Sequence, residues 1–271
     1  MRNETLFASE LALLFRRRRT WAMLAALAAV PVLIGVAVKV SSSPSSGRGP
    51  DFLDQVAGNG LFTALVGILV CIPLFLPLTV AVVAGDAIAG EAGHGTLRYL
   101  LISPVSRLRL LVVKYIGAAV FCVVAVGVVA LAGIGIGLLL FPVGPVTLIS
   151  GDTVSLGQGL ARIGLVAAYV ALSLLGLAAL GLFISTLTDV PIGAMAATAV
   201  LAVVAQILGS LPQLDWLHAW LFTNHWLDFA DLLRQPVLWD SFGQNALLQG
   251  GYLLVFGALA YGRFASKDIL S

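Results

Sequence analysis

Long apolar runs separated by short polar stretches make up most of this chain. A helix of about 20 apolar residues crosses the hydrocarbon core of a bilayer, which is about 30 Å thick. Six segments approach or exceed this length, and we expect each to form a membrane-spanning helix: 21–40, 61–85, 110–141, 163–186, 191–211 and 246–261. The third is longer than a crossing requires, so it is expected to tilt or to begin at the membrane surface.

Composition supports the same interpretation. Hydrophobic residues make up 60% and charged residues 10% of the 271 positions, which is far more apolar surface than one soluble core can bury. We therefore expect an all-α membrane protein with a single domain over residues 1–271. The net charge of +2 is too small to indicate nucleic acid as a partner. Cys71 and Cys122 fall within apolar runs, where thiols pack as small hydrophobic groups, so neither a disulfide framework nor redox chemistry is expected.

The cations are distributed unequally between the two sides of the six-helix arrangement. One side has few: Lys39, Arg48, Arg162 and Arg234. The other side has many: Arg2, Arg16, Arg17, Arg18, Arg19, Arg98, Arg107, Arg109, Lys114, Arg263 and Lys267. Because loops rich in Lys and Arg stay in the cytoplasm, both termini are expected there, in the cytoplasmic (inner) membrane of the cell. The first apolar run follows four arginines and is too long for a signal peptide, so we expect it to be retained.

The N-terminal segment 1–19 is expected to form a helix in the membrane interface. Phe7, Leu11 and Leu14 share one side, although Glu10 interrupts this apolar face, and the arginines that follow would bind anionic headgroups. In the alternative interpretation the arginines only fix the topology.

Motifs for catalysis or metal binding are absent from the sequence. The chain has no GxxxxGK[ST] phosphate loop, no HExxH zinc motif and no GxSxG nucleophile elbow. We therefore expect no catalytic residues, no metal ligands and no cofactor, and do not expect an enzyme.

Few polar groups approach the spans. Asp86 and Asp189 are placed at cytoplasmic helix ends, where solvated capping is favoured over a role in ion coupling. Gln206 and Asn245 are expected to form hydrogen bonds between helices. Gly133 and Gly137 in GIGIG have the spacing that lets helices approach closely, either within the chain or at a subunit interface.

The segment GEAGHGTLRYLLISPVSRLRLLVVKY, residues 90–115, is unusually polar for its position between two spans. Thr96 is a candidate N-cap for a short helix that ends before Pro104, and Ser106 is a candidate N-cap for the next helix. Such a helix between hinge glycines suits docking into a groove of a partner, with Tyr99 and the leucines as anchors. Alternatively, it is an amphipathic turn lying on the membrane.

These residues resemble the signature of ABC-2 type permeases, the membrane subunits of ATP-binding cassette exporters. In that family a glutamate precedes Gly-Thr, a short Leu-rich helix, Pro-x-Ser-Arg and a Lys in the next span. The matching positions here are Glu91, Gly95, Thr96, Leu97, Leu100, Leu101, Pro104, Ser106, Arg107 and Lys114. The C-terminal RFASKDIL, residues 263–270, is similar to the cationic tail of the same family.

The resemblance implies a partner and a site. Two permease subunits would pair, as a homodimer or a heterodimer, and each would dock a cytoplasmic ATPase subunit that binds ATP and Mg²⁺. The docking site would be a cytoplasmic coupling helix between spans 2 and 3, formed by Glu91, Gly95, Thr96, Leu97, Arg98, Tyr99, Leu100, Leu101 and Arg107.

The resemblance also implies short external helices within Pro212–Asn245, between spans 5 and 6. This segment contains Trp216, Trp220, Trp226 and Trp239 with Phe222 and Phe229, a composition suited to the headgroup boundary. An ordinary exposed aromatic loop is the alternative.

The expected function is therefore that of an exporter permease without its own ATPase, moving a lipid-like, hydrophobic or drug-like substrate outward. A membrane scaffold or channel without an ATPase partner is the alternative. The coupling-like segment is the feature that separates the two.

Overall fold

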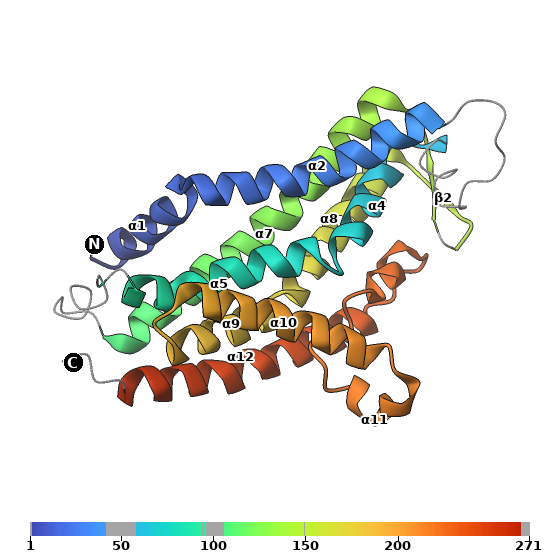
Figure 1. Cartoon of the computed structure of the whole chain (residues 1–271). Coiled ribbons are helices and arrows are strands. Elements are labelled where there is room, and N and C mark those ends of the chain that lie inside the picture. The colour runs from blue at the N-terminus through green and yellow to red at the C-terminus, as the bar shows by residue number, and fades with distance from the viewer. Residues whose placement is uncertain (1, 42–57, 94, 96–105, 149, 267–271) are drawn as a thin grey trace.

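The protein is an elongated bundle of helices whose two termini lie at the same end (Figure 1). The computed structural model describes residues 2–41, 58–93, 95, 106–148 and 150–266. The main helices are α1 (Arg2–Arg16), α2 (Arg18–Ser41), α4 (Phe62–Cys71), α5 (Phe75–Gly93), α7 (Arg107–Leu140), α8 (Leu156–Ser173), α9 (Leu175–Leu187), α10 (Pro191–Gly209) and α12 (Asp240–Ser266). Shorter elements are the strands β1 (Val146–Thr147) and β2 (Thr153–Val154) and the helical turns η1 (Pro212–Leu214), α11 (Asp215–His218) and η2 (Asp228–Leu233).

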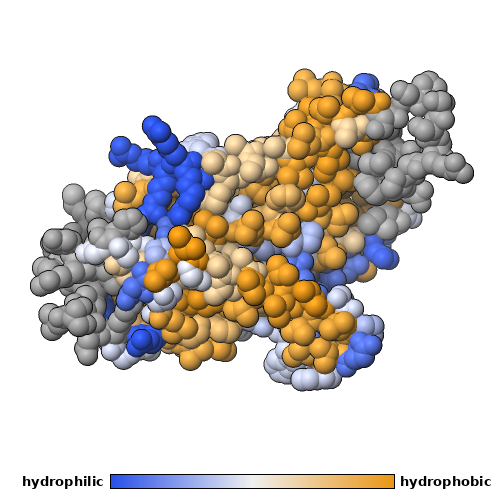
Figure 2. Space-filling model, viewed as in Figure 1, coloured by the Kyte–Doolittle hydropathy of each residue, from blue (hydrophilic) through white to orange (hydrophobic). Residues whose placement is uncertain are grey.

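Five helical segments of the described chain are long and apolar enough to cross a membrane: Arg18–Val40, Phe75–Gly93, Arg107–Leu140, Leu156–Leu187 and Pro191–Gly209. Large apolar side chains remain exposed along them, and Figure 2 shows the apolar surface extending over the length of the bundle. An apolar exterior of this extent indicates contact with lipid, so the fold is an all-helical multi-pass membrane protein. The sixth expected span falls within α12, which has 27 residues and is less apolar than these five.

Two of the expected spans are broken in the structure. Residues 61–85 were expected to form one helix, but the chain turns at residues 72–74 and divides it into α4 and α5. Pro73 lies in this break and has no N–H to continue the helix. The helix α5 then runs to Gly93, beyond the expected end. Similarly, the expected span 163–186 begins earlier, at Leu156, and is interrupted at Leu174, between α8 and α9.

Helices α4 and α7 approach so closely that glycine is required at their contact. A Cβ atom on Gly133 would overlap the backbone of Ala64, and one on Gly137 would overlap the carbonyl group of Gly60. The close packing expected from the GIGIG spacing is therefore confirmed within the chain. Its alternative, a subunit interface at Gly133 and Gly137, is wrong because α4 and the residues before it already cover both positions.

We call the end of the bundle near Arg17, Arg107 and Arg263 the arginine end, and the opposite end, near Trp216, Trp226 and Trp239, the aromatic end. At the aromatic end, the segment between α10 and α12 folds over the helices in short turns. Phe222, Trp226 and Phe229 are buried in the main core, whereas Trp216, Trp220 and Trp239 are exposed. The aromatic segment is thus not a simple exposed loop. Three of its six large rings pack into the bundle, and the other three lie on the surface.

A fully hydrogen-bonded polar network anchors this segment from inside. Asn245 on α12 donates to the Ser173 hydroxyl at 2.7 Å, and Gln249 donates to the Phe222 carbonyl at 2.9 Å. Gln249 also accepts from the backbone N–H of Gly176, and the indole of Trp226 donates to the Ser173 carbonyl. The expected bonding of Asn245 between helices is confirmed. It stabilises the break between α8 and α9, where backbone groups lose their helical partners.

Candidate functional site

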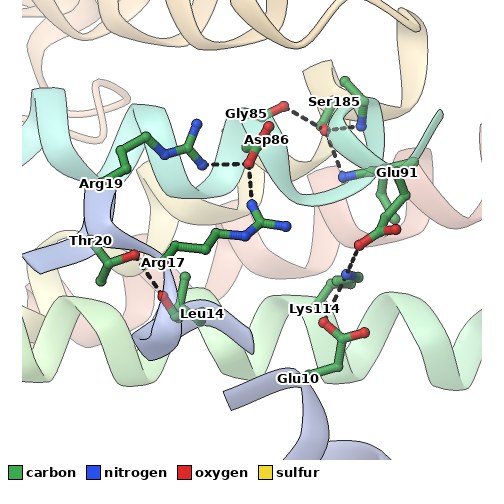
Figure 3. Close-up of polar contacts among 12 residues, drawn as sticks. Glu10, Leu14, Arg17, Arg19, Thr20, Gly85, Asp86, Glu91, Lys114 and Ser185 are labelled. Atoms are coloured by element: carbon green, nitrogen blue, oxygen red, sulfur yellow. Dashed lines mark hydrogen bonds and ion pairs between the residues drawn. The ribbon is translucent and has the colours of Figure 1, made fainter. Parts of the chain in front are cut away.

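A compact group of six charged side chains lies at the arginine end, where α1, α2, α5 and α7 meet. We call it the charged cluster, and it consists of Glu10, Arg17, Arg19, Asp86, Glu91 and Lys114 (Figure 3). It contains three acids and three bases, so its formal charge is zero.

Lys114 is the most buried cation of the cluster, with 8% of its side chain exposed. Its ammonium group donates to Glu10 of α1 at 2.7 Å and to Glu91 of α5 at 3.1 Å. Both carboxylates are largely buried as well. A lysine at this position on α7 is tolerable only because two acids compensate its desolvation, so the three residues join α1, α5 and α7.

The other half of the cluster is formed by Asp86 and the two arginines that pair with it, Arg17 and Arg19. The Asp86 side chain is 8% exposed, and one carboxylate oxygen accepts from Arg17 at 2.6 Å and also from Arg19. Asp86 lies in the interior of α5, so the solvated helix cap expected at this residue is wrong. Asp189, the other acid near the spans, is exposed in the short link between α9 and α10.

Beside Asp86, the backbone of α5 forms hydrogen bonds with a side chain of α9. The Ser185 hydroxyl of α9 donates to the Gly85 carbonyl at 2.7 Å and accepts from the N–H groups of Ile88 and Ala89. A Cβ atom on Gly90 would come within 2.5 Å of the Asp86 carboxylate, so this glycine leaves room for the acid. These contacts fix α9 to the α5 backbone at the level of the cluster.

The helix α1 is therefore docked on the bundle as well as amphipathic. Glu10, which interrupts its apolar face, points toward Lys114 in Figure 3. Of the four arginines that follow, Arg17 and Arg19 pair with Asp86. The interpretation in which these arginines only fix the topology is thus incomplete. The side chains of Arg16 and Arg18 are exposed, and Figure 2 shows the polar surface at this end.

The expected coupling segment is only partly within the described residues. Gly95 has a positive φ of 71°, which suits glycine at the hinge after α5. Ser106 caps α7 by accepting from the N–H of Arg109, as predicted. Arg107 donates to the carbonyls of Phe264 and Ala265 at the end of α12. The remaining expected site residues, Thr96, Leu97, Arg98, Tyr99, Leu100 and Leu101, lie outside the described residues.

The arrangement connects the two helices that flank residues 94–105. Glu91 at the end of α5 is paired with Lys114, two turns into α7, and Lys114 is paired with α1. Arg107 joins the start of α7 to α12. A displacement applied to this segment would therefore act on four helices through charged contacts. Among the described residues no group of three or more His, Cys, Asp or Glu side chains is placed to hold a metal ion.

Sequence reasoning identified Glu91 and Arg107 as site residues but did not include Glu10, Arg17, Arg19, Asp86 and Lys114. Signals were available for three of these five. Asp86 and Lys114 each lie within an apolar run, and Glu10 interrupts an apolar face, so each needed a partner of opposite charge. What the sequence lacks is the relative depth and rotation of the helices, which decide which charges meet.

Comparison with known families places the chain beside an uncharacterised family. The model of a family described as "Protein of unknown function (DUF2705)" matches residues 24–270. No curated protein matches the chain.

Proposed function

The chain belongs to the DUF2705 family of unknown function, and we propose that it is the permease subunit of an ATP-binding cassette exporter of the ABC-2 type. It moves a lipid-like, hydrophobic or drug-like substrate outward across the cytoplasmic membrane, and a separate ATPase subunit that binds ATP and Mg²⁺ supplies the energy. Two ATPase subunits and a second permease subunit complete the transporter.

One observation carries this proposal. The segment that resembles a coupling helix connects α5 and α7, and these two helices are fastened to each other and to α1 by the charged cluster. A mechanical input at residues 94–105 needs such a rigid connection to reach the membrane helices. An interfacial turn without a partner has no need of buried ion pairs that are costly to assemble.

The proposed topology has six spans, with α12 as the sixth and both termini in the cytoplasm. Its support is the distribution of cations: Lys39, Arg162 and Arg234 belong to the aromatic end, whereas the other cations of the described chain belong to the arginine end. In this topology α1 lies on the cytoplasmic surface, and η1, α11 and η2 lie outside.

The test is copurification of the proposed ATPase subunit, sought in the reading frames next to that of this chain, with the parent protein and with Tyr99→Ala. If Tyr99 is a central anchor of the docking surface, its truncation costs about 2 kcal/mol or more, which is roughly a 30-fold loss of affinity. Tyr261→Ala is the matched control, because Tyr261 is exposed on α12. The parent chain alone is expected to hydrolyse no ATP.

A second variant tests transmission rather than docking. Glu91→Arg places a cation beside Lys114, so the chain is expected to insert and bind its ATPase but to show strongly reduced transport-linked ATP hydrolysis. If neither variant differs from the parent in copurification and ATPase rate in reconstituted membranes, the segment is an interfacial turn and the proposal is wrong. Sustained hydrolysis by the chain alone would also contradict it.

A further inference from the structure

An open apolar groove of about 720 Å³ runs along α12 at the aromatic end. One wall is α12, and the other is the turn that contains Ala219, Trp220 and His225. Figure 1 shows the segment with α11 projecting from the bundle near the beginning of α12. The volume lies within the range of about 300 to 1,000 Å³ that is usual for sites of small ligands.

The groove is held open by contacts within the chain. The Tyr252 hydroxyl donates to the Trp220 carbonyl at 2.8 Å and so fixes the turn to α12. The Tyr252 ring stacks on Phe256 at 5.5 Å and meets Phe222 edge to face. A Cβ atom on Gly251, which lines the groove, would have no atom within 4 Å. The cavity therefore exists before any ligand binds.

The polarity of the lining changes along the groove. Gln244 lies at the end of the groove nearest the start of α12, and the apolar residues Val255 and Phe256 lie at the other end. The turn adds the N–H groups of Trp220 and His225, and its Trp220 carbonyl is hydrogen-bonded to Tyr252. Trp220 is 71% exposed, which is typical of a tryptophan at the headgroup boundary. An occupant must therefore be polar at the end near Gln244 and apolar toward Val255 and Phe256.

The length of the groove matches one leaflet of the bilayer. Gln244 and Val255 are 11 positions apart on α12, a distance of about 16 Å along a helix. Half of the hydrocarbon core is about 15 Å thick. If the Gln244 end lies at the headgroup level, the Val255 end reaches the middle of the membrane.

From this geometry we propose that the groove along α12 binds one acyl chain of an amphiphile from the leaflet at the aromatic end, with its polar group beside Gln244. The proposal rests on the six-span topology, in which α12 crosses the membrane. It narrows the substrate class of the permease to single-chain or double-chain lipids and lipid-like compounds.

The test uses the full chain in phosphatidylcholine nanodiscs that contain a phosphatidylcholine with a diazirine in the middle of one acyl chain. After illumination, the labelled residues are mapped by mass spectrometry. Crosslinks are expected to concentrate at Leu248, Gly251 and Val255. Leu254 and Leu259 serve as references for ordinary surrounding lipid, because both are exposed on α12 but do not line the groove.

Two adjacent glycines provide matched variants. A side chain on Gly251 enters the groove, whereas Gly250 does not line it, and a Cβ atom on either would meet no other atom. Gly251→Leu is expected to lower crosslinking in the groove about fivefold or more, and Gly250→Leu to leave it unchanged. Val255→Trp is a second blocking variant should Gly251→Leu fail to fold.

Three results would overturn the proposal. Crosslinking at the groove positions that only equals that at Leu254 and Leu259 indicates surrounding lipid alone. Equal crosslinking in the parent and in both blocking variants shows that the groove holds no chain. A disulfide between two copies of Val255→Cys shows that a second copy of the chain covers the groove. None of these measurements uses ATP, so they are independent of copurification with the ATPase.

Discussion

At the scale of single residues, Lys114 is the buried cation whose charge compensates two largely buried acids, Glu10 and Glu91. Lys114→Met removes the buried cation that both carboxylates contact and is expected to destabilise the protein by about 3 to 5 kcal/mol. The measurement is the thermal unfolding midpoint of the purified chain in detergent.

The control for this variant is Lys39→Met. Lys39 lies at the aromatic end, where its ammonium group is 5.8 Å from the centre of the Phe141 ring. Within the part of the chain that the structure describes, it forms no ion pair with an acid. A small effect is expected there. Glu10→Gln and Glu91→Gln combined with Lys114→Met should recover much of the lost stability, since no uncompensated charge remains. Equal midpoints for Lys114→Met and Lys39→Met would refute the assigned role of Lys114.

Removal of two different buried hydroxyl groups is expected to change the stability of the protein in different ways. The Ser185 hydroxyl makes three hydrogen bonds to the α5 backbone, so Ser185→Ala is expected to cost about 1 to 3 kcal/mol. The Thr63 hydroxyl is the buried side-chain group that has no hydrogen-bond partner among the residues described. Thr63→Val keeps its shape and is expected to be neutral or stabilising. Unfolding midpoints that fall equally for both variants would contradict this assignment.

The sequence predicted which residues of the cluster are unusual better than it predicted what they contact. The cap at Ser106 depends on residues three positions apart and is confirmed. Gln206, expected to bond to another helix, donates to the Pro73 carbonyl in the break between α4 and α5 at 2.7 Å, and the sequence did not identify this partner. Asp86 was assigned to solvent because its two arginine partners lie 67 and 69 positions earlier. The periodicity of a sequence relates residues a few positions apart, so it does not predict contacts between residues this far apart in the chain.

At the scale of the elements, the α4 and α7 pair is held together by glycine contacts. Gly133→Ala forces a Cβ atom against the backbone of Ala64 and is expected to destabilise the protein by about 1 to 3 kcal/mol. Gly135 lies two positions away with open space around it, so Gly135→Ala is expected to be neutral or to stabilise by up to about 1 kcal/mol. The unfolding midpoints in detergent separate the two, and a Gly133→Ala protein as stable as Gly135→Ala would contradict the contact.

Helix existence was predictable from apolar run length, but helix breaks were not. The breaks at Pro73 and Leu174 fall inside continuous apolar sequence, where hydropathy gives no signal. A proline does not by itself predict a helix break, because Pro31 lies inside the unbroken helix α2. What differs is the tertiary environment: the Pro73 carbonyl finds a side-chain donor in Gln206.

At the scale of the whole molecule, the question is whether α12 crosses the membrane. In the proposed topology Ser106→Cys and Ser266→Cys are inside, whereas Ser45→Cys and Gln235→Cys are outside. A membrane-impermeant thiol reagent applied to intact cells is expected to modify only the second pair. Ser266→Cys that reacts like Gln235→Cys would exclude α12 as a span, and Ser106→Cys that reacts like Ser45→Cys would overturn the orientation.

The whole-molecule architecture was accessible from composition because a bilayer imposes one length on every crossing helix. The packing of the aromatic segment was not accessible, since Trp226 and Trp220 have the same composition signal but only Trp226 is buried. Which ring turns inward depends on the Ser173 carbonyl that receives the Trp226 indole. This acceptor is provided by another helix.

The docking of α1 also has a consequence for biogenesis. This helix is the first part of the described chain to leave the ribosome, yet the partner of Arg17 follows 69 positions later and that of Glu10 follows 104 positions later. During synthesis α1 therefore remains in solvent or at the membrane surface, without these contacts, until α5 and α7 have been inserted. We expect its closure onto the bundle to be a late step in assembly, one that takes place only after the first half of the protein has reached the membrane.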